Sequence, residues 1–142
     1  MKNNKLVMTM LILLVAITLV GAVALVVVLK VSGEEKPKGP TIDEVLESSV
    51  DIPEITTNLA SDDFIRISFK IQTDSKKAKE ELEKRDFQVR NIIIHELSEK
   101  KTEDLQASQG KASLEEALKG KLNALMQEGK VEKVYITGSL LQ

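Results

Sequence analysis

Residues 6–29 form an apolar run, LVMTMLILLVAITLVGAVALVVVL, that contains no charged side chain. A helix needs about 20 apolar residues to cross a hydrocarbon core ~30 Å thick, and this run is longer than that. It also lacks the internal charges that mark ion or proton pathways through membranes. The sequence therefore predicts one transmembrane helix over residues 6–29, which anchors the protein and does not conduct.

A cleaved secretory signal is the alternative interpretation of this run. Lys2 and Lys5 precede it, and Ala22 and Ala24 belong to an A-x-A triplet of the kind found at cleavage sites. However, the run continues to Leu29, whereas the apolar core of a signal has about 7–15 residues. We therefore expect an uncleaved, single-pass anchor.

The orientation of the anchor rests on the length of the N-terminal tail. Lysines are about equally frequent on the two flanks, so the positive-inside rule does not decide the matter. A very short tail before a span usually stays inside the cell. We expect residues 1–5 to be a cytoplasmic tail and the C-terminal domain to be extracytoplasmic.

The remainder of the chain divides into a linker and one domain. Residues 30–41, KVSGEEKPKGPT, have the Gly, Pro and charge content of a linker. Residues 42–142 are enough for one hydrophobic core. Residues 41–142 carry 15 basic and 20 acidic side chains, so no basic excess would attract nucleic acid. Because the chain has no cysteine, a lipid anchor on cysteine is excluded.

Two strands are predicted at the start of the domain. Residues 64–73, FIRISFKIQT, alternate strictly, with Ile65, Ile67, Phe69 and Ile71 on one face. Such alternation is typical of a strand with one buried and one solvated face. A shorter strand over residues 55–59 precedes turn residues and can pair with it as a hairpin.

A helical segment is expected within residues 74–101, DSKKAKEELEKRDFQVRNIIIHELSEKK. Asp74 or Ser75 can cap its start, and a kink or break is expected near Arg85 and Asp86, because Phe87 is out of step with the apolar period. The apolar positions at helical spacing are Ala78, Leu82, Val89, Ile93 and Leu97.

The last helix and the closing strand complete the domain. Ser113 and Glu116 have the spacing of a capping box, which predicts a helix start at Ser113. Gly129 is placed to end this helix in a left-handed cap. The apolar stripe of the helix is Leu114, Leu118, Leu122 and Leu125.

The closing strand is expected to place Val134, Ile136 and Leu140 on one face, and its ladder hydrogen bonds should hold the end of the chain in place. The resulting order is anchor, linker, β-β-α-α-β. It predicts an α+β fold with helices on one face of a largely antiparallel sheet.

Candidate catalytic residues are few. His95 is the only histidine, and without Cys or further His it cannot form a zinc site. The acidic pairs at residues 62–63 and 103–104 have the character of turn and cap residues. Nucleophile, phosphate-binding and dinucleotide-binding motifs are absent from the sequence. We expect a protein that is not an enzyme and has no catalytic residues, cofactor or metal.

Longer segments of the chain carry a family resemblance. They are TTNLASDDFIRISFKIQ at residues 56–72, KKAKEELEKRDFQVRNIIIHELSEKKTEDLQ at 76–106 and GKASLEEALKGKLNALMQEGKVEKVYITGSLLQ at 110–142. In this order, and behind a long apolar span, they resemble the FliL family of flagellar basal-body-associated proteins. Two positions depart from the family pattern: Asn91 stands where relatives usually have Asp, and residues 136–139 replace a Phe-Thr-Glu-Phe-like run.

The resemblance implies a single-pass protein of the cytoplasmic membrane whose outer domain has a stomatin-like fold. It implies self-association into a ring around or beside the flagellar stator units, in support of torque, swimming and swarming. The alternative is a membrane-tethered binding or sensor module unrelated to motility. The positions that match family motifs, as structural or interface residues, are Asn58, Leu59, Arg90, Asn91, Gly110, Leu114, Tyr135 and Thr137.

Overall fold

The computed structural model describes residues 2–33 and 39–142 and divides into two compact units, Met1–Gly39 and Pro40–Gln142. The first unit contains helix α1 (Lys2–Gly33). Its segment Asn3–Gly33 is long and apolar enough to cross a membrane, and none of its most apolar stretch is buried in the structure. The helix extends beyond the predicted 6–29 span, so residues 30–33 of the predicted linker are helical. Residues 34–38 of that linker lie outside the described residues.

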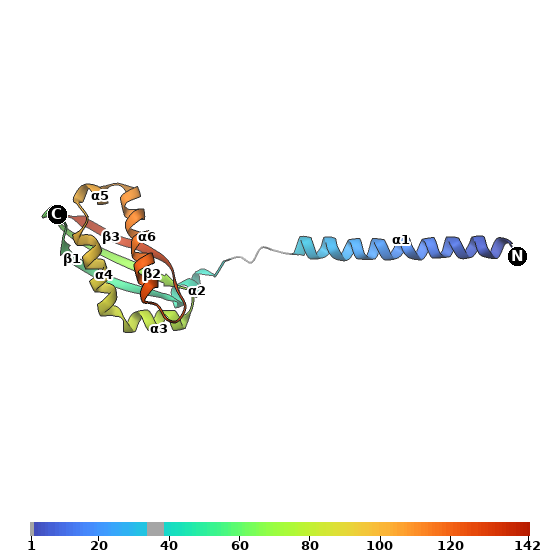
Figure 1. Ribbon diagram of the computed structural model, residues 1–142, viewed down its shortest axis with the longest axis horizontal. Helices are drawn as coiled ribbons and strands as arrows, with labels where there is room; N and C mark the ends of the chain where they lie inside the picture. Colours follow the sequence, from blue (N-terminus) through green and yellow to red (C-terminus); the bar gives the residue numbers. More distant parts are fainter. Residues whose placement is uncertain (1, 34–38) are drawn as a thin grey trace. The chain divides into compact units, whose positions relative to one another are not determined.

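The second unit is built on an antiparallel sheet of three strands in the order β1-β2-β3 (Figure 1). These are β1 (Ser49–Asn58), β2 (Phe64–Thr73) and β3 (Val131–Leu141). The predicted strand over residues 64–73 is confirmed as the central strand, and all four of its predicted apolar positions are buried. The hairpin with β1 is confirmed as well.

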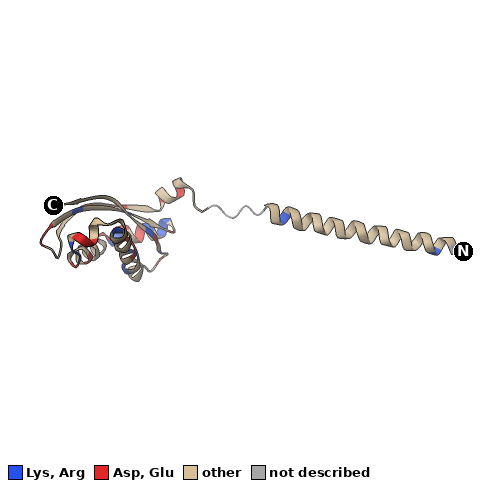
Figure 2. Ribbon diagram, turned by 90° about the horizontal axis from the view of Figure 1, so that it is seen from above, with Lys and Arg blue, Asp and Glu red and all other residues tan. Residues whose placement is uncertain are grey.

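Helices cover one face of this sheet and leave the other open (Figure 2). α3 (Lys76–Lys84) packs on β1 and β2, α4 (Asp86–Ser98) on β1, and α6 (Ser108–Leu125) on β3. Two short helices were not predicted: α2 (Ile42–Glu47) before the sheet and α5 (Thr102–Gln106) between α4 and α6. The α+β class is confirmed, while the simple order β-β-α-α-β omits these helices.

The core lies between the sheet and these helices. Leu82, Val89, Ile93 and Leu97, which were predicted from helical spacing, are at most 1% exposed. In the stripe predicted for the last helix, Leu114, Leu118 and Leu122 are buried, whereas Leu125 is only partly buried. The predicted break near Arg85 is confirmed, because α3 ends at Lys84 and α4 begins at Asp86. Ser75 caps α3, its hydroxyl accepting a hydrogen bond from the Ala78 N–H at 3.1 Å.

β1 is longer than the predicted strand because a bulge accommodates Pro53. The register with β2 shifts between Ile52 and Ile55, which brackets this proline. Proline cannot donate to a ladder and is tolerated in sheets at edges and bulges. The strand therefore begins at Ser49, although its apolar alternation is broken.

The predicted start of the last helix at Ser113 is wrong. α6 begins at Ser108, directly after the extended residue Ala107, so Ser113 lies inside the helix. The helix starts early because Gly110 lets its first turn approach the backbone of α5 closely. Gly129 does have a positive φ of 70°, but α6 ends at Leu125, so this glycine shapes the loop before β3 and not the helix end.

The prediction that Leu140 shares a face with Val134 and Ile136 is also wrong. On β2, Ser68 pairs with Gly138 and the next residue, Phe69, pairs with Ile136, so Thr137 is an extra residue in β3. Such a bulge exchanges the faces beyond it. Leu140 is consequently 51% exposed, while Leu141 packs against the core.

The end of the chain is held as expected. The N–H of Gln142 donates to the C=O of Phe64, and the N–H of Phe64 donates to the C=O of Gln142, both at 2.8 Å. β3 is nevertheless an edge strand, because it pairs with β2 alone in the described sheet.

Candidate functional site

The polar residues considered for catalysis have structural positions. Asp63 accepts hydrogen bonds from Ser61 and Thr102, and Asp104 accepts one from the Lys101 N–H at 2.9 Å. These contacts confirm the predicted turn and cap roles. His95 is exposed on α4. Among the described residues, no three His, Cys, Asp or Glu side chains come together as metal ligands do.

Three of the eight family-motif positions are packed against other elements of the domain. Leu59 and Leu114 are 4% and 0% exposed and belong to the core. A Cβ on Gly110 would lie 1.6 Å from the carbonyl oxygen of Asp104, so only glycine fits there. The structure therefore gives these residues packing roles.

The hairpin turn beside Leu59 is tied to the connection between α4 and α5. The N–H of Ala60 donates to the C=O of Lys100 at 2.8 Å. The Ser61 hydroxyl accepts from the Thr102 N–H at 3.1 Å. This explains why the NLA and Lys-Thr segments, about 40 residues apart in the sequence, act as one structural unit.

Arg90 and Asn91 lie on the surface of α4. Arg90 forms an ion pair with Asp86 one turn earlier, at 2.8 Å. Asn91 is exposed and lines a depression of about 350 Å³ together with Phe87 and Ile92. Phe87 is 71% exposed, which is unusual for a phenylalanine and makes this part of α4 a candidate contact surface.

Tyr135 and Thr137 lie on the open face of the sheet, and Asn58 is exposed at the end of β1. The Tyr135 hydroxyl donates to the side chain of Gln72 at 3.0 Å, and Lys133 lies 4.8 Å above the Tyr135 ring. The Thr137 hydroxyl hydrogen-bonds to Ser68 at 3.1 Å. These side chains cross-link neighbouring strands on the face that no helix covers (Figure 2).

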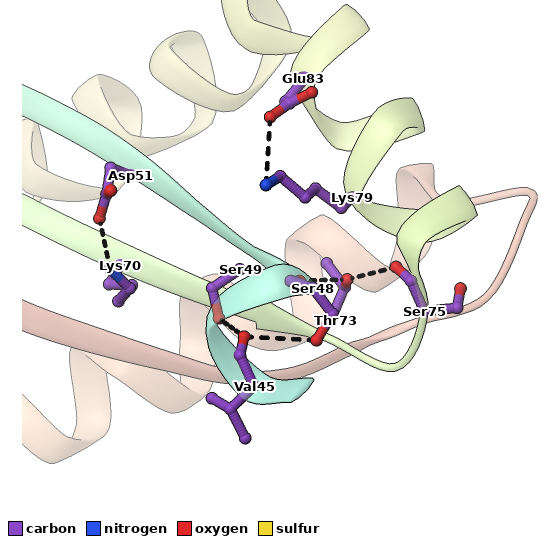
Figure 3. A network of polar contacts seen from close by, with 9 residues as sticks. All are labelled: Val45, Ser48, Ser49, Asp51, Lys70, Thr73, Ser75, Lys79 and Glu83. Atoms are coloured by element: carbon purple, nitrogen blue, oxygen red, sulfur yellow. Dashed lines mark hydrogen bonds and ion pairs between the residues drawn. The ribbon is translucent and has the colours of Figure 1, made fainter. Parts of the chain in front are cut away.

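A polar network joins α2 to the beginning of the sheet (Figure 3). The Thr73 hydroxyl donates to the C=O of Ser48 and of Ser75, and the Ser49 hydroxyl donates to the C=O of Val45. The Thr73 N–H also donates to the C=O of Ser48 at 3.0 Å. The segment that follows the linker is thus fastened to the central strand.

A depression of about 570 Å³ lies beside this junction. Apart from Pro40, its lining residues are polar or charged. Pockets for small molecules are usually lined mainly by apolar and aromatic side chains. This depression therefore does not favour a ligand-binding module.

Glu96 is a buried charge that the sequence did not reveal. It is 5% exposed on α4 and forms ion pairs with Lys121 of α6 and, at 3.6 Å, with Lys100. The hydrogen bond from Lys121 is the main reason why the pKa of Glu96 lies below its ordinary value. Its position next to Leu97 on the buried side of the helix is the signal that could have predicted it.

Glu81 holds the loop between α6 and β3. Its carboxylate accepts hydrogen bonds from the N–H of Glu128 at 2.7 Å and of Gln127 at 3.0 Å, and from Arg85 at 2.9 Å. The hydrogen bond from the Glu128 backbone is the first cause of the lowered pKa of Glu81. Both carboxylates thus lock elements together, and their environment favours rigid surfaces over acid-base chemistry.

Comparisons with known proteins identify similar chains. Residues 49–142 match the family model described as flagellar basal body-associated protein FliL. The flagellar protein FliL of Bacillus subtilis (strain 168) is 50% identical over 109 residues, which cover 77% of this chain and 78% of the relative. The flagellar protein FliL of Aquifex aeolicus (strain VF5) is 26% identical over 93 residues, covering 63% and 58%.

Proposed function

The chain belongs to the FliL family of flagellar basal-body-associated proteins, and from this premise we propose that it is an accessory protein of the flagellar motor that acts by assembly and not by catalysis. The observation that carries the proposal is the family match over residues 49–142, which include all three strands and helices α3 to α6. The buried or cross-linking roles of Asp63, Glu81 and Glu96 support it, because these carboxylates are used to hold elements together.

We further propose that α1 anchors the protein in the cytoplasmic membrane, with residues 1–5 inside and the domain outside the cytoplasm. The length and apolar character of α1 support the anchor. The orientation can be measured with a reporter active only outside the cytoplasm, fused after Gln142. Activity of a reporter that works only inside would contradict the proposed topology.

We propose that the outer domain has a stomatin-like fold. The outer domains would form a ring-like homo-oligomer around or beside the stator units. In this position the protein would support torque generation, swimming and swarming. The exposed Phe87 and Asn91 and the partly buried Tyr135, positions without a catalytic arrangement around them, support a role through contacts.

Deletion of the gene in the source bacterium tests this function. We expect reduced swimming and swarming at an unchanged growth rate, and restoration by the full chain supplied from a plasmid. A fluorescent fusion should co-localise with basal bodies. Unchanged motility together with diffuse localisation would favour the alternative, a membrane-tethered module unrelated to the flagellum.

A further inference from the structure

In each of the two edge strands, β1 and β3, alternate residues direct their backbone N–H and C=O groups away from β2. Phe64 and Gln142 exchange both hydrogen bonds across β2 and β3. Because bonded pairs alternate in antiparallel ladders, the N–H and C=O groups of Ser139 and Leu141 point away from β2. The same alternation on the other side directs Ile65 and Ile67 towards β1, so the backbone groups of Thr56 and Asn58 also point outwards.

One half of each edge is closed to further pairing. On β3, the Asn123 side chain bonds both the N–H and the C=O of Val131, at 2.7 and 3.1 Å, and Glu115 accepts from the Ile136 N–H at 3.0 Å. On β1, the bulge contains Pro53, and Asp51 places a charge beside it. Prolines, bulges and charges are the features by which natural sheets block edge pairing.

The other half of each edge is open. In the described part of the chain, no side chain caps the backbone of residues 56–58 or 139–141. Thr56, Asn58 and Ser139 are exposed, and Leu140 is 51% exposed. These segments contain no charged side chain, so nothing repels a second strand.

The open halves lie at the same level of the sheet. Arg66 of β2 pairs with Thr56 on one side and with Leu140 on the other. The closed halves coincide as well, because Phe69 pairs with Ile52 beside the bulge and with Ile136 at the Glu115 contact. A copy placed beside another in the same orientation therefore meets an open segment with an open segment.

We propose that copies of this chain pair head to tail, with residues 139–141 of β3 in one copy beside residues 56–58 of β1 in the next. β1 and β3 run parallel within a domain, since both are antiparallel to β2, so the contact is a short parallel pairing. It is heterologous and can close into a ring. The inference rests on the self-association in the proposed function and assigns it a surface.

Head-to-tail repetition keeps every α2 at the same end of the sheet, because each copy is related to the next without being turned end over end. In the proposed function the copies are confined to one membrane. Such confinement raises their effective concentration and compensates for a short contact.

Thiol cross-linking of the full chain in membrane vesicles tests the pairing, because the natural chain has no cysteine. Thr56→Cys and Leu140→Cys are placed in separate copies that are produced together, so that no reagent can join two thiols of one copy. Both positions lie at the level of Arg66 on the open face. A short bis-maleimide tolerates a shift of two residues along the strands, about 7 Å. We expect covalent dimers that contain one copy of each variant. The matched control, Asp51→Cys mixed with Leu140→Cys, places one thiol on the closed half of β1 and should give none.

Two results would overturn the proposal. Covalent dimers from Leu140→Cys alone would indicate a β3–β3 contact. Equal amounts of mixed dimer, or no mixed dimer, from the Thr56→Cys and Leu140→Cys pair and from its control would exclude the open edges. An amine-reactive cross-linker on the unmodified chain distinguishes self-association from the specific edge contact. If it gives covalent oligomers while the thiol variants give no cross-link, the chain self-associates through another surface, and the pairing of β3 with β1 is wrong. Unchanged melting curves of the variants confirm that they are folded.

Discussion

Gly110 lies where the first turn of α6 passes closest to α5. A side chain there would meet the carbonyl of Asp104, whereas a Cβ on Gly120, further along the same helix, would meet no atom within 4 Å. Glu96 shows the same dependence on surroundings, because its carboxylate is stable in the core only through Lys121 and Lys100. Single residues in this domain are thus constrained by neighbours from other elements.

Gly110→Ala should lower the free energy of unfolding by about 1–3 kcal/mol, because the added methyl group overpacks the contact between α5 and α6. Gly120→Ala is the matched control. It should raise the free energy of unfolding by roughly 0.5–1 kcal/mol through better helix propensity. Urea unfolding of the full chain in detergent measures both, and equal effects of the two substitutions would contradict the packing role of Gly110.

Glu96 should make stability depend on pH below its ordinary pKa. Because the pKa of Glu96 is lowered in the folded state, its contribution is fully present above the unfolded pKa of about 4.5 and is lost as the pH falls through the folded value. Glu96→Gln should lower the free energy of unfolding by about 1–3 kcal/mol at pH 7. It should also weaken the decrease in stability at low pH.

The pH dependence is measured by urea unfolding between pH 7 and pH 3. Glu116→Gln, an exposed substitution on α6, is the control and should change stability by no more than about 0.5 kcal/mol. A parallel decline in the wild type and in Glu96→Gln would show that the ion pairs of Glu96 do not contribute.

Among the elements, β3 connects the sheet to helix α6. It contributes the buried residues Val131 and Val134, contacts α6 and completes the ladder on β2. Its bulge at Thr137 orients Leu141 towards the core and Leu140 outwards. The strand is therefore both the closure of the core and an exposed edge.

Removal of residues 136–142 should abolish cooperative unfolding of the domain, because β2 would lose its partner over residues 64–69 and the core would lose Ile136 and Leu141. Removal of Gln142 alone deletes only the two terminal hydrogen bonds and should lower the melting temperature by a few degrees, for about 1–2 kcal/mol. Circular dichroism on heating compares them. A melting transition that survives the longer truncation unchanged would refute the role of β3.

The whole molecule consists of an apolar helix and a domain that is compact without it. Pro40–Gln142 forms its own unit, and its core contains no residue of α1. In the proposed function, α1 would add location and local concentration, while the domain would supply the surfaces.

A chain lacking residues 1–39 should be recovered in the soluble fraction with the domain's melting transition retained, because no core contact is lost. Exported to the outside of the cytoplasmic membrane, it should fail to restore motility to a deletion strain, since weak contacts need confinement to one membrane. Cell fractionation measures the solubility, thermal melting measures the stability of the domain, and swimming assays measure the restoration of motility. Full restoration of motility would show that the anchor is dispensable.

The long apolar helix, the central strand, the hairpin and the break at Arg85 could be predicted from residue order, because each depends on the polarity of near neighbours in the chain. The family could be predicted too, from segments that together cover most of the domain. The bulges at Pro53 and Thr137 and the early start of α6 could not. Each depends on contacts between segments far apart in the sequence. Those contacts also determine which backbone edges stay open, and hence which surface the chain can offer to another copy of itself.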